Sequence, residues 1–284
     1  MIGGARRSRL LWAVYVAAAT AVCLVIAFPG RELAAYASAR LRAGLPGLEV
    51  RLAAVRPAFP PGVALEGLQF AAGDRPLAFV ERLEVRPEWS SLSGSRTAWR
   101  FTARAGAGTL EGRAQTPAAP SGTFEGIRLE EIPALRNVAF GRVAGRLDGR
   151  FGPTEAGGLG VSLRLADGRL EPAAPLFRQE RFLFPSGTAE LTWQAGLLLV
   201  RNARVRGNEV DLEISGSIRL GPAAGEGTVD LSGRILPHAG FVSRAGDDLP
   251  AALLRRRGGI PFRVSGPLSA PEISLSGGGG GSGT

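Results

Sequence analysis

The residues that could carry catalysis lie close together in the sequence. His238, the only histidine, stands in LPHAG, and Asp247 and Asp248 follow a few residues later. A histidine oriented by a carboxylate activates the serine nucleophile of many hydrolases. The chain has no G-x-S-x-G sequence, and nothing marks a serine placed to attack. We therefore interpret His238 as a solvated loop residue, predict no catalytic residues and do not expect an enzyme.

Metal and cofactor sites find little support. One histidine and one cysteine, Cys23, exclude the common zinc-binding spacings. The sequence RAGDDLP around Asp247 lacks the alternating oxygen ligands of a calcium loop. The chain contains no lysine, so a Walker phosphate loop is excluded. We expect no metal and no cofactor.

The charge balance argues against nucleic acid as a partner. The 34 basic residues are all arginine and face 25 acidic ones, which gives a net charge of +9. The arginines form no long basic stripe of the kind that nucleic-acid-binding proteins carry. The densest run is LLRRRGG at 253–259. It is either a contact for lipid phosphates or an acidic partner, or a solvated turn, since three arginines fall short of the usual polybasic segment.

The N-terminal segment predicts a membrane anchor. From Leu10 to Phe28 there are 19 residues without a charge. As a helix they span about 28 Å, close to the hydrocarbon thickness of a bilayer. Positive charge stays on the cytoplasmic side of a membrane, so the arginines before this segment set the topology. They are Arg6, Arg7 and Arg9.

A cleaved signal peptide is the alternative to a retained anchor. The sequence ASA at 37–39 could mimic a cleavage site. It lies well beyond the end of the apolar run, and the apolar region of a signal peptide is only about 7–15 residues long. We therefore predict a single-pass protein of the bacterial inner membrane, with a cytoplasmic N-terminus and a periplasmic body.

The remaining sequence divides into three parts. Apolar residues at helical spacing in 31–47 predict a short juxtamembrane helix within the linker 29–47. Residues 48–275 switch to a period of two and form a predicted periplasmic β-domain. Residues 276–284 are a glycine-rich, flexible tail by composition. Before these parts, the predicted anchor comprises a cytoplasmic N-terminus (1–9) and a transmembrane helix (10–28).

Alternation in the β-domain predicts one apolar and one wet face. The clearest strand is 209–220, where apolar residues occupy every second position except Gly216. Such a pattern is typical of antiparallel sheets. Elsewhere, Leu197 and Leu199 are expected to share a face with Ala203 and Val205, and Arg201 interrupts this face. The candidate groove or core face consists of Val210, Leu212, Ile214, Ile218, Val229, Leu231, Phe262 and Val264.

Glycines recur in the apolar phase of these strands. Gly145, Gly216, Gly233 and Gly266 each stand between two apolar residues of the same phase. A glycine there removes a side chain from the core face and eases bending. We predict a mainly β fold built on a long, curved, mostly antiparallel sheet, either an AsmA-like groove or a sandwich. The alternative is that each glycine is a bulge without function.

An open apolar face would form a hydrophobic groove for acyl chains or a partner strand, whereas a covered one is an ordinary core. Six segments bear on this choice, because their ordered series resembles the type II secretion system protein N family, GspN, over nearly the whole chain. They are VRPAFPPGVALEGLQF (55–70), LEVRPEW (83–89), LEEIPAL (129–135), GRLDGRF (145–151), GNEVDLEISGSIRL (207–220) and GGIPFRVSGPLSAPEISL (258–275).

The resemblance to GspN implies a non-enzymatic component of the type II secretion system, which exports folded proteins from the periplasm across the outer membrane. Its partners would be other inner-membrane and periplasmic components of that system. The ending FRVSGPLSAPEISL (262–275) also resembles the closing strands of AsmA-like and TamB-like envelope proteins. That second resemblance implies the alternative function, the binding or transfer of phospholipid.

Overall fold

The structure is a computed structural model, and it describes most of the chain. The described residues are 12, 15–16, 28–44, 49–58, 62–72, 75–91, 97–116, 118–136, 141–175, 179–221, 227–245, 259–268 and 270–275. Most of the predicted anchor 10–28, the pair Asp247 and Asp248, the arginine run and the tail 276–284 lie outside them. Among the described residues, no helix has the length and apolar character that spanning a membrane requires.

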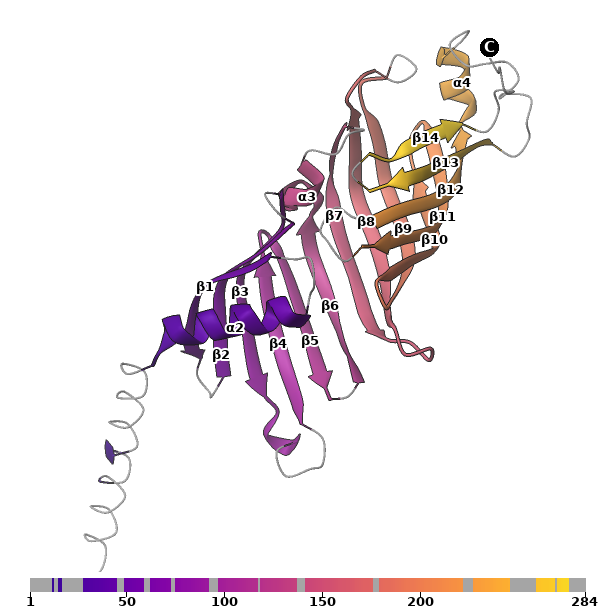
Figure 1. The fold of residues 1–284 in the computed structure, drawn as a ribbon. Coiled ribbons are helices and arrows are strands. Elements are labelled where there is room, and N and C mark those ends of the chain that lie inside the picture. Colours follow the sequence, from indigo (N-terminus) through magenta and orange to yellow (C-terminus); the bar gives the residue numbers. More distant parts are fainter. Residues whose placement is uncertain are drawn as a thin grey trace, which may run out of the picture.

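All fourteen strands belong to one antiparallel sheet (Figure 1). They are β1 (Glu49–Ala58), β2 (Gly62–Ala72), β3 (Arg75–Pro87), β4 (Ala98–Ala105), β5 (Gly108–Gln115), β6 (Ala118–Arg128), β7 (Gly141–Pro153), β8 (Leu159–Pro172), β9 (Phe182–Gln194), β10 (Leu197–Arg206), β11 (Val210–Leu220), β12 (Gly227–Pro237), β13 (Ile260–Pro267) and β14 (Glu272–Leu275). The helices are α2 (Gly30–Gly44), α3 (Pro133–Arg136) and α4 (Ala239–Ala245), with 3₁₀ turns η1 (Trp89–Ser91) and η2 (Leu129–Glu131).

The strand order follows the chain from β1 to β14, so each strand pairs only with its sequence neighbours. The prediction of a mainly β, antiparallel fold is confirmed. The sandwich alternative is wrong for the described part of the chain, because its strands form a single open sheet and no second one. Hairpin turns with positive-φ glycines, such as Gly106 and Gly196, make this simple order possible.

One face of the sheet is apolar and the other polar. Residues opposite each other on neighbouring strands share a face. The row Val161, Leu191 and Val200 therefore belongs to the apolar face, and the row Thr123 and Arg150 belongs to the polar face. Exposure follows this division, because Thr123 and Arg150 are exposed while the three apolar residues are half-buried. The predicted alternation thus extends across the sheet.

A bulge in β10 changes which of its side chains lie on the apolar face. The register of β10 shifts at Arg201, so Leu199 pairs with Thr192 while Ala203 pairs with Ala189. The prediction that Leu197 and Leu199 share a face with Ala203 and Val205 is wrong, because the extra residue turns the strand over. The side chain of Arg201 donates to Thr192 Oγ1 at 3.1 Å.

Two residues with positive φ mark further phase changes. In β2, Gly67 has φ 65°, and its partner strand β1 buries both Val50 and Val55, which strict alternation would place on opposite faces. In β8, Asp167 has φ 53°, and the neighbouring strand β9 buries Phe182 and Phe184. These irregularities keep the apolar face continuous where the sequence leaves the period of two.

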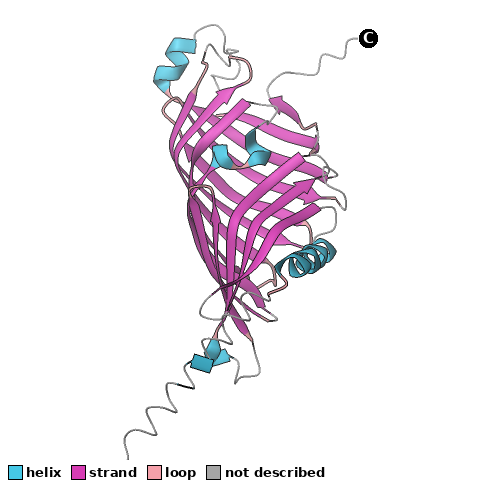
Figure 2. Cartoon of the chain, turned by 90° about the vertical axis from the view of Figure 1, so that its left-hand side faces the viewer, coloured by secondary structure: helices cyan, strands magenta, loops and turns pink. Residues whose placement is uncertain are grey.

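The sheet is strongly coiled. In Figure 1, β10 to β14 run across the direction of β4 to β7, and in Figure 2 the near and far strands cross at a large angle. η2 and α3 follow β6, yet α3 reaches β3, three strands away. Glu131 of η2 accepts a hydrogen bond from the main chain of Ala107, in the β4–β5 turn, at 2.9 Å. The predicted curvature is therefore present.

Helix α2 packs beside β1, the first strand of the sheet. It covers Gly30–Gly44, within the segment predicted as a juxtamembrane helix. Gly30 lies against the main-chain carbonyl of Val55, where a Cβ would meet the oxygen. Ala34 and Ser38, one and two turns further along, are buried. A helix beside an outermost strand protects it from pairing with other chains.

Candidate functional site: the apolar face of the sheet

The apolar face runs from the first strand to the last. Its large side chains are mostly half-buried rather than fully enclosed, since no second sheet covers them among the described residues. Uncovered apolar surface of this extent marks a site of interaction in other proteins. From β4 to β13 its members include Phe101, Leu110, Phe124, Leu147, Phe151, Leu163, Leu191, Val200, Ile214, Leu231 and Val264.

Phenylalanine rings lie over glycines in the middle of this face. One row of the register reads Phe101, Gly112, Gly122 and Phe151 across β4 to β7. A Cβ on Gly112 would lie 2.5 Å from the ring of Phe101, and one on Gly122 would lie 2.8 Å from the ring of Phe151. The two rings stack with centroids 6.3 Å apart, although three inter-strand spacings of about 4.8 Å separate their strands. The glycines thus leave room for aromatic rings close to the main chain of the sheet.

The same pairing recurs in both halves of the molecule. Phe124 covers Gly149 of β7, and Phe262 of β13 covers Gly233 of β12. Each ring shields main chain that a glycine leaves bare. The glycine phase is visible in the sequence, but these partners are not, because cross-strand pairs depend on the register.

The other predicted glycines divide into two groups. Gly216 and Gly266 stand in register with Leu231 and Val229, as their apolar phase predicts. Gly145 instead lies opposite a bulge of β8, where Asp167 and Gly168 face it and the register shifts. Its N–H donates to Glu130 Oε2 at 3.1 Å, so a carboxylate satisfies it outside the ladder. At this position the bulge lies in the neighbouring strand and not at the glycine itself.

The structure brings the eight predicted groove residues together on three neighbouring strands. Leu212 pairs with Ile235, Ile218 with Val229, and Leu231 with Val264. Ile214 and Phe262 both stand opposite Gly233. Val210 and Val229 are buried, and the other six are half-buried. This patch is part of the larger face described above.

One end of the face is closed. We call it the helix end, because η2 and α3 follow the end of β6 there and α4 follows the end of β12 (Figure 1). Phe241 of α4 packs against Phe182, with ring centroids 6.3 Å apart. The core here consists of Phe182, Phe184, Val210, Phe241 and Ile260. At this end the apolar face is therefore an ordinary core.

The opposite end carries large aromatic residues that remain accessible. We call it the tryptophan end, since Trp89, Trp99 and Trp193 all lie there. Trp99 pairs with Pro87 at the end of β3, Trp89 follows in η1, and Trp193 pairs with Leu198 at the start of β10. Trp89 is 59% exposed and Trp99 40%. Each tryptophan stands within about two residues of a strand end, which is the signal in the sequence that could have located this end.

His238 is held by its surroundings. It precedes α4, and its main-chain N–H donates to Glu209 at 2.9 Å. Its Nδ1 lies 3.0 Å from the carbonyl of Asn208, and its Nε2 lies 3.3 Å from Asp211 Oδ1. These contacts fix the start of α4, so His238 has a structural explanation.

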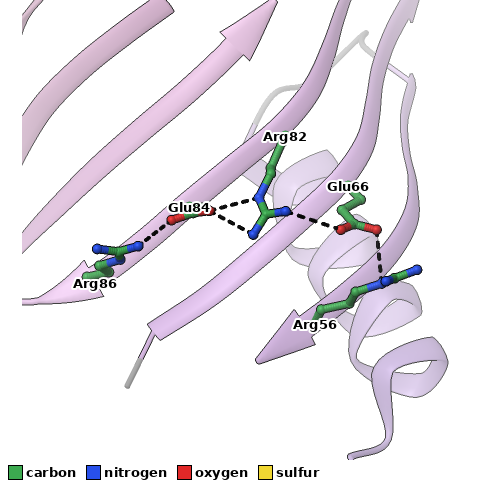
Figure 3. Close-up of polar contacts among 5 residues, drawn as sticks. All are labelled: Arg56, Glu66, Arg82, Glu84 and Arg86. Carbon is green, nitrogen blue, oxygen red and sulfur yellow. Dashed lines mark hydrogen bonds and ion pairs between the residues drawn. The ribbon is translucent and has the colours of Figure 1, made fainter. Parts of the chain in front are cut away.

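The polar face carries chains of ion pairs. Figure 3 shows Arg56, Glu66, Arg82, Glu84 and Arg86 joined across β1 to β3, on the side of these strands away from α2. Burial alone would raise the pKa of the Glu84 carboxyl. Hydrogen bonds and charge attraction from Arg86 and Arg82 outweigh that effect, so its pKa lies below the ordinary value.

Alternative sites in the described residues are weaker. No group of three metal-ligating side chains occurs there. A hollow of about 390 Å³ on the polar face between β6 and β10 is open and lined by charges of both signs, including Glu125, Arg150, Arg164 and Glu190.

Comparisons with family models, curated proteins and solved structures found no match. The apolar face is therefore the strongest candidate site.

Proposed function

We propose that this protein binds phospholipid acyl chains on its apolar face, as an AsmA-like lipid-binding or lipid-transfer protein of the cell envelope. The observation that carries the proposal is the continuous, half-buried apolar surface of a sheet whose described residues form no second layer. A face of this kind needs an apolar partner, because water in contact with it costs about 25 cal/mol per Å².

Hydrocarbon chains suit this surface better than a polypeptide does. An acyl chain has no hydrogen-bonding groups to satisfy, whereas main-chain polar groups pressed against an apolar floor lose their partners. The rings of Phe101, Phe124 and Phe151 lie over glycines, close to the main chain of the sheet. One leaflet of bilayer hydrocarbon is about 15 Å thick, shorter than the roughly 27 Å of an eight-residue strand. A chain therefore fits along a strand.

The test is photocrosslinking of the full-length protein in its native membranes. A photoreactive residue at Ile214 reports on the apolar face, and one at Glu213, its neighbour on the same strand, reports on the polar face. We expect phospholipid adducts at Ile214 and few at Glu213. Native mass spectrometry of the gently extracted protein should show bound phospholipid. Lipid-free protein without adducts at Ile214 would refute lipid binding.

The type II secretion function is the second candidate. Besides the resemblance to GspN, the last strand, β14, favours it. This strand has only four residues, its outer edge has no strand partner within the described chain, and Ile273 is 60% exposed. Such an edge can accept a strand from another component. Co-purification with secretion components and a secretion defect on deletion would support this function, and the absence of both would refute it.

A further inference from the structure

We propose that the tryptophan end docks on the surface of an anionic phospholipid bilayer, so that the apolar face opens toward the membrane. Three observations independent of the acyl-chain argument meet at this end: the tryptophans, a row of arginines and the point where the chain enters the body. The docking surface consists of Trp89, Trp99 and Trp193 with Arg86, Arg100 and Arg113.

The three tryptophans have the character of interfacial anchors. An indole has an apolar body and an N–H donor, and tryptophan is enriched where a membrane meets water. The sequence contains four tryptophans, and three of them occur at this one end of the sheet. Trp89 is 59% exposed and Trp99 40%, which is a cost in water unless something covers them.

A row of arginines lies on the polar face at this end, and its member Arg100 directly follows Trp99 in β4. Arg86 pairs with Arg100, and Arg100 pairs with Arg113, across β3 to β5. Like charges placed directly opposite each other on a sheet are unfavourable. All three side chains are at least 45% exposed, so anions from outside can reach them.

Two carboxylates only partly neutralise this row. Glu88 accepts from Arg113 Nη2 at 2.7 Å and lies 3.5 Å from Arg100 Nη2. Glu84 Oε2 forms an ion pair with Arg86 Nη2 at 2.6 Å. Arg82 also shares Glu84, at 2.8 Å, so these two carboxylates serve four guanidinium groups. Guanidinium binds phosphate in the same forked geometry as carboxylate. Phosphates of lipid headgroups match the remaining positive charge.

The chain enters the sheet domain at the same end. Gly30 lies against Val55, three residues before the end of β1. β3 ends at the same end of the sheet, where η1 follows it. Phe28 is the last residue of the predicted transmembrane segment and begins the continuous described stretch 28–44 that contains α2. A helix 10–28 would therefore leave the membrane beside the tryptophan end, whereas α3 and α4 lie at the far end (Figure 1).

Docking in this way has a direct consequence for the apolar face. Trp99 and Phe101 are alternate residues of β4, so the tryptophan lies at the mouth of the phenylalanine floor. With this end at the level of the headgroups, an acyl chain could move between the bilayer and the sheet without crossing water. The helix end, closed by the core around Phe241, would point away from the membrane.

The experiment uses tryptophan fluorescence of the full chain in vesicles of about 70% phosphatidylcholine and 30% phosphatidylglycerol with brominated acyl chains. One variant keeps Trp99 alone and replaces Trp12, Trp89 and Trp193 by phenylalanine. The matched control replaces all four tryptophans by phenylalanine and adds His238→Trp at the helix end. We expect bromolipid to quench Trp99 at least threefold more than the tryptophan at 238. Equal quenching at both ends would overturn the proposal.

Arginine variants test the anionic part of the claim. Replacing the row (Arg86→Gln, Arg100→Gln, Arg113→Gln) should remove most of the dependence of Trp99 quenching on phosphatidylglycerol. The control removes three arginines at the helix end: Arg142→Gln, Arg169→Gln and Arg181→Gln. If both triple variants behave alike, the row does not bind the membrane surface.

A photoreactive residue at Trp89 in the otherwise unchanged chain covers the case in which multiple replacements impair folding. Its lipid adducts should exceed those of a probe at His238, and equal yields would contradict docking. The two proposals fail separately. Lipid adducts at Ile214 with equal quenching at both ends would leave acyl-chain binding intact and reject this orientation. Strong quenching at Trp99 without adducts at Ile214 would do the reverse.

Discussion

The two ends of the sheet use the same apolar alternation for different purposes. At the helix end, Phe182, Phe184 and Phe241 are at least 94% buried and form a core. At the tryptophan end, Trp89 and Trp99 keep 40–59% of their surface accessible. The difference teaches that an apolar strand face is not by itself a core, since it becomes one only where another element covers it.

The connections between strands explain the difference. At the helix end the chain leaves β6 through η2 and α3, and leaves β12 through α4, before the next strand begins. Several connections at the tryptophan end are short turns, such as the one between β9 and β10 around Ala195 and Gly196. α3 and α4 supply covering side chains at the helix end, whereas Trp89 of the single-turn connection η1 at the tryptophan end stays exposed.

The largest expected effect breaks the core at the helix end. Phe241→Ala removes a ring that is 97% buried, and loss of a buried phenylalanine costs about 3–5 kcal/mol. Urea unfolding of the full chain in detergent should show this loss of unfolding free energy. Trp89→Ala at the other end is the control, and we expect less than about 1 kcal/mol from it. Similar losses in both variants would show that the two ends are packed alike.

A smaller effect should follow from filling a glycine under a ring. In Gly112→Ala the new Cβ would lie 2.5 Å from Phe101 and 2.7 Å from the carbonyl of Ser121, and such overpacking costs about 1–3 kcal/mol. Gly152→Ala is the matched control, since its Cβ would meet only Ser121 Cβ at 3.6 Å. Chemical denaturation of both variants makes the comparison. A tolerated alanine at 112 would mean that the ring does not rest on the glycine.

The smallest effect concerns the ion pairs of the polar face. Because the pKa of Glu84 is lowered in the folded protein, its ionised form stabilises the fold above the ordinary pKa of 4.5, and this contribution is lost as the pH falls through the folded value. Glu84→Gln should cost roughly 0.2–1 kcal/mol at neutral pH. Well below that pKa the variant and the natural protein should unfold alike. Urea curves at both pH values measure this, and a pH-independent difference would contradict it.

The sequence predicted the apolar patch better than it predicted the strand phase. The alternation of Val210, Leu212 and Ile214 is local and survives in the sheet, because neither β11 nor β12 is bulged where they pair. The phase of β10 failed at Arg201, since a bulge depends on the neighbouring strand's register as much as on its own residues.

The rest of the site depends on contacts between distant residues. The sequence near Phe101 does not indicate that its ring covers Gly112 and stacks on Phe151. Both contacts depend on the curvature of the sheet and on the register of its strands. The gathering of Trp89, Trp99 and Trp193 likewise follows from the number of strands between them, which sets the end at which each one emerges. The predicted anchor 10–28 stays a prediction.

The simple strand order has a consequence for how such a molecule can form and change. Every strand pairs only with its predecessor and its successor, so no pairing joins strands that are distant in the strand order. In arrays of this kind each unit depends mainly on its neighbours. The sheet can therefore grow strand by strand as the chain emerges. Adding or deleting one hairpin would change its length by about 10 Å and leave the remaining pairs in place.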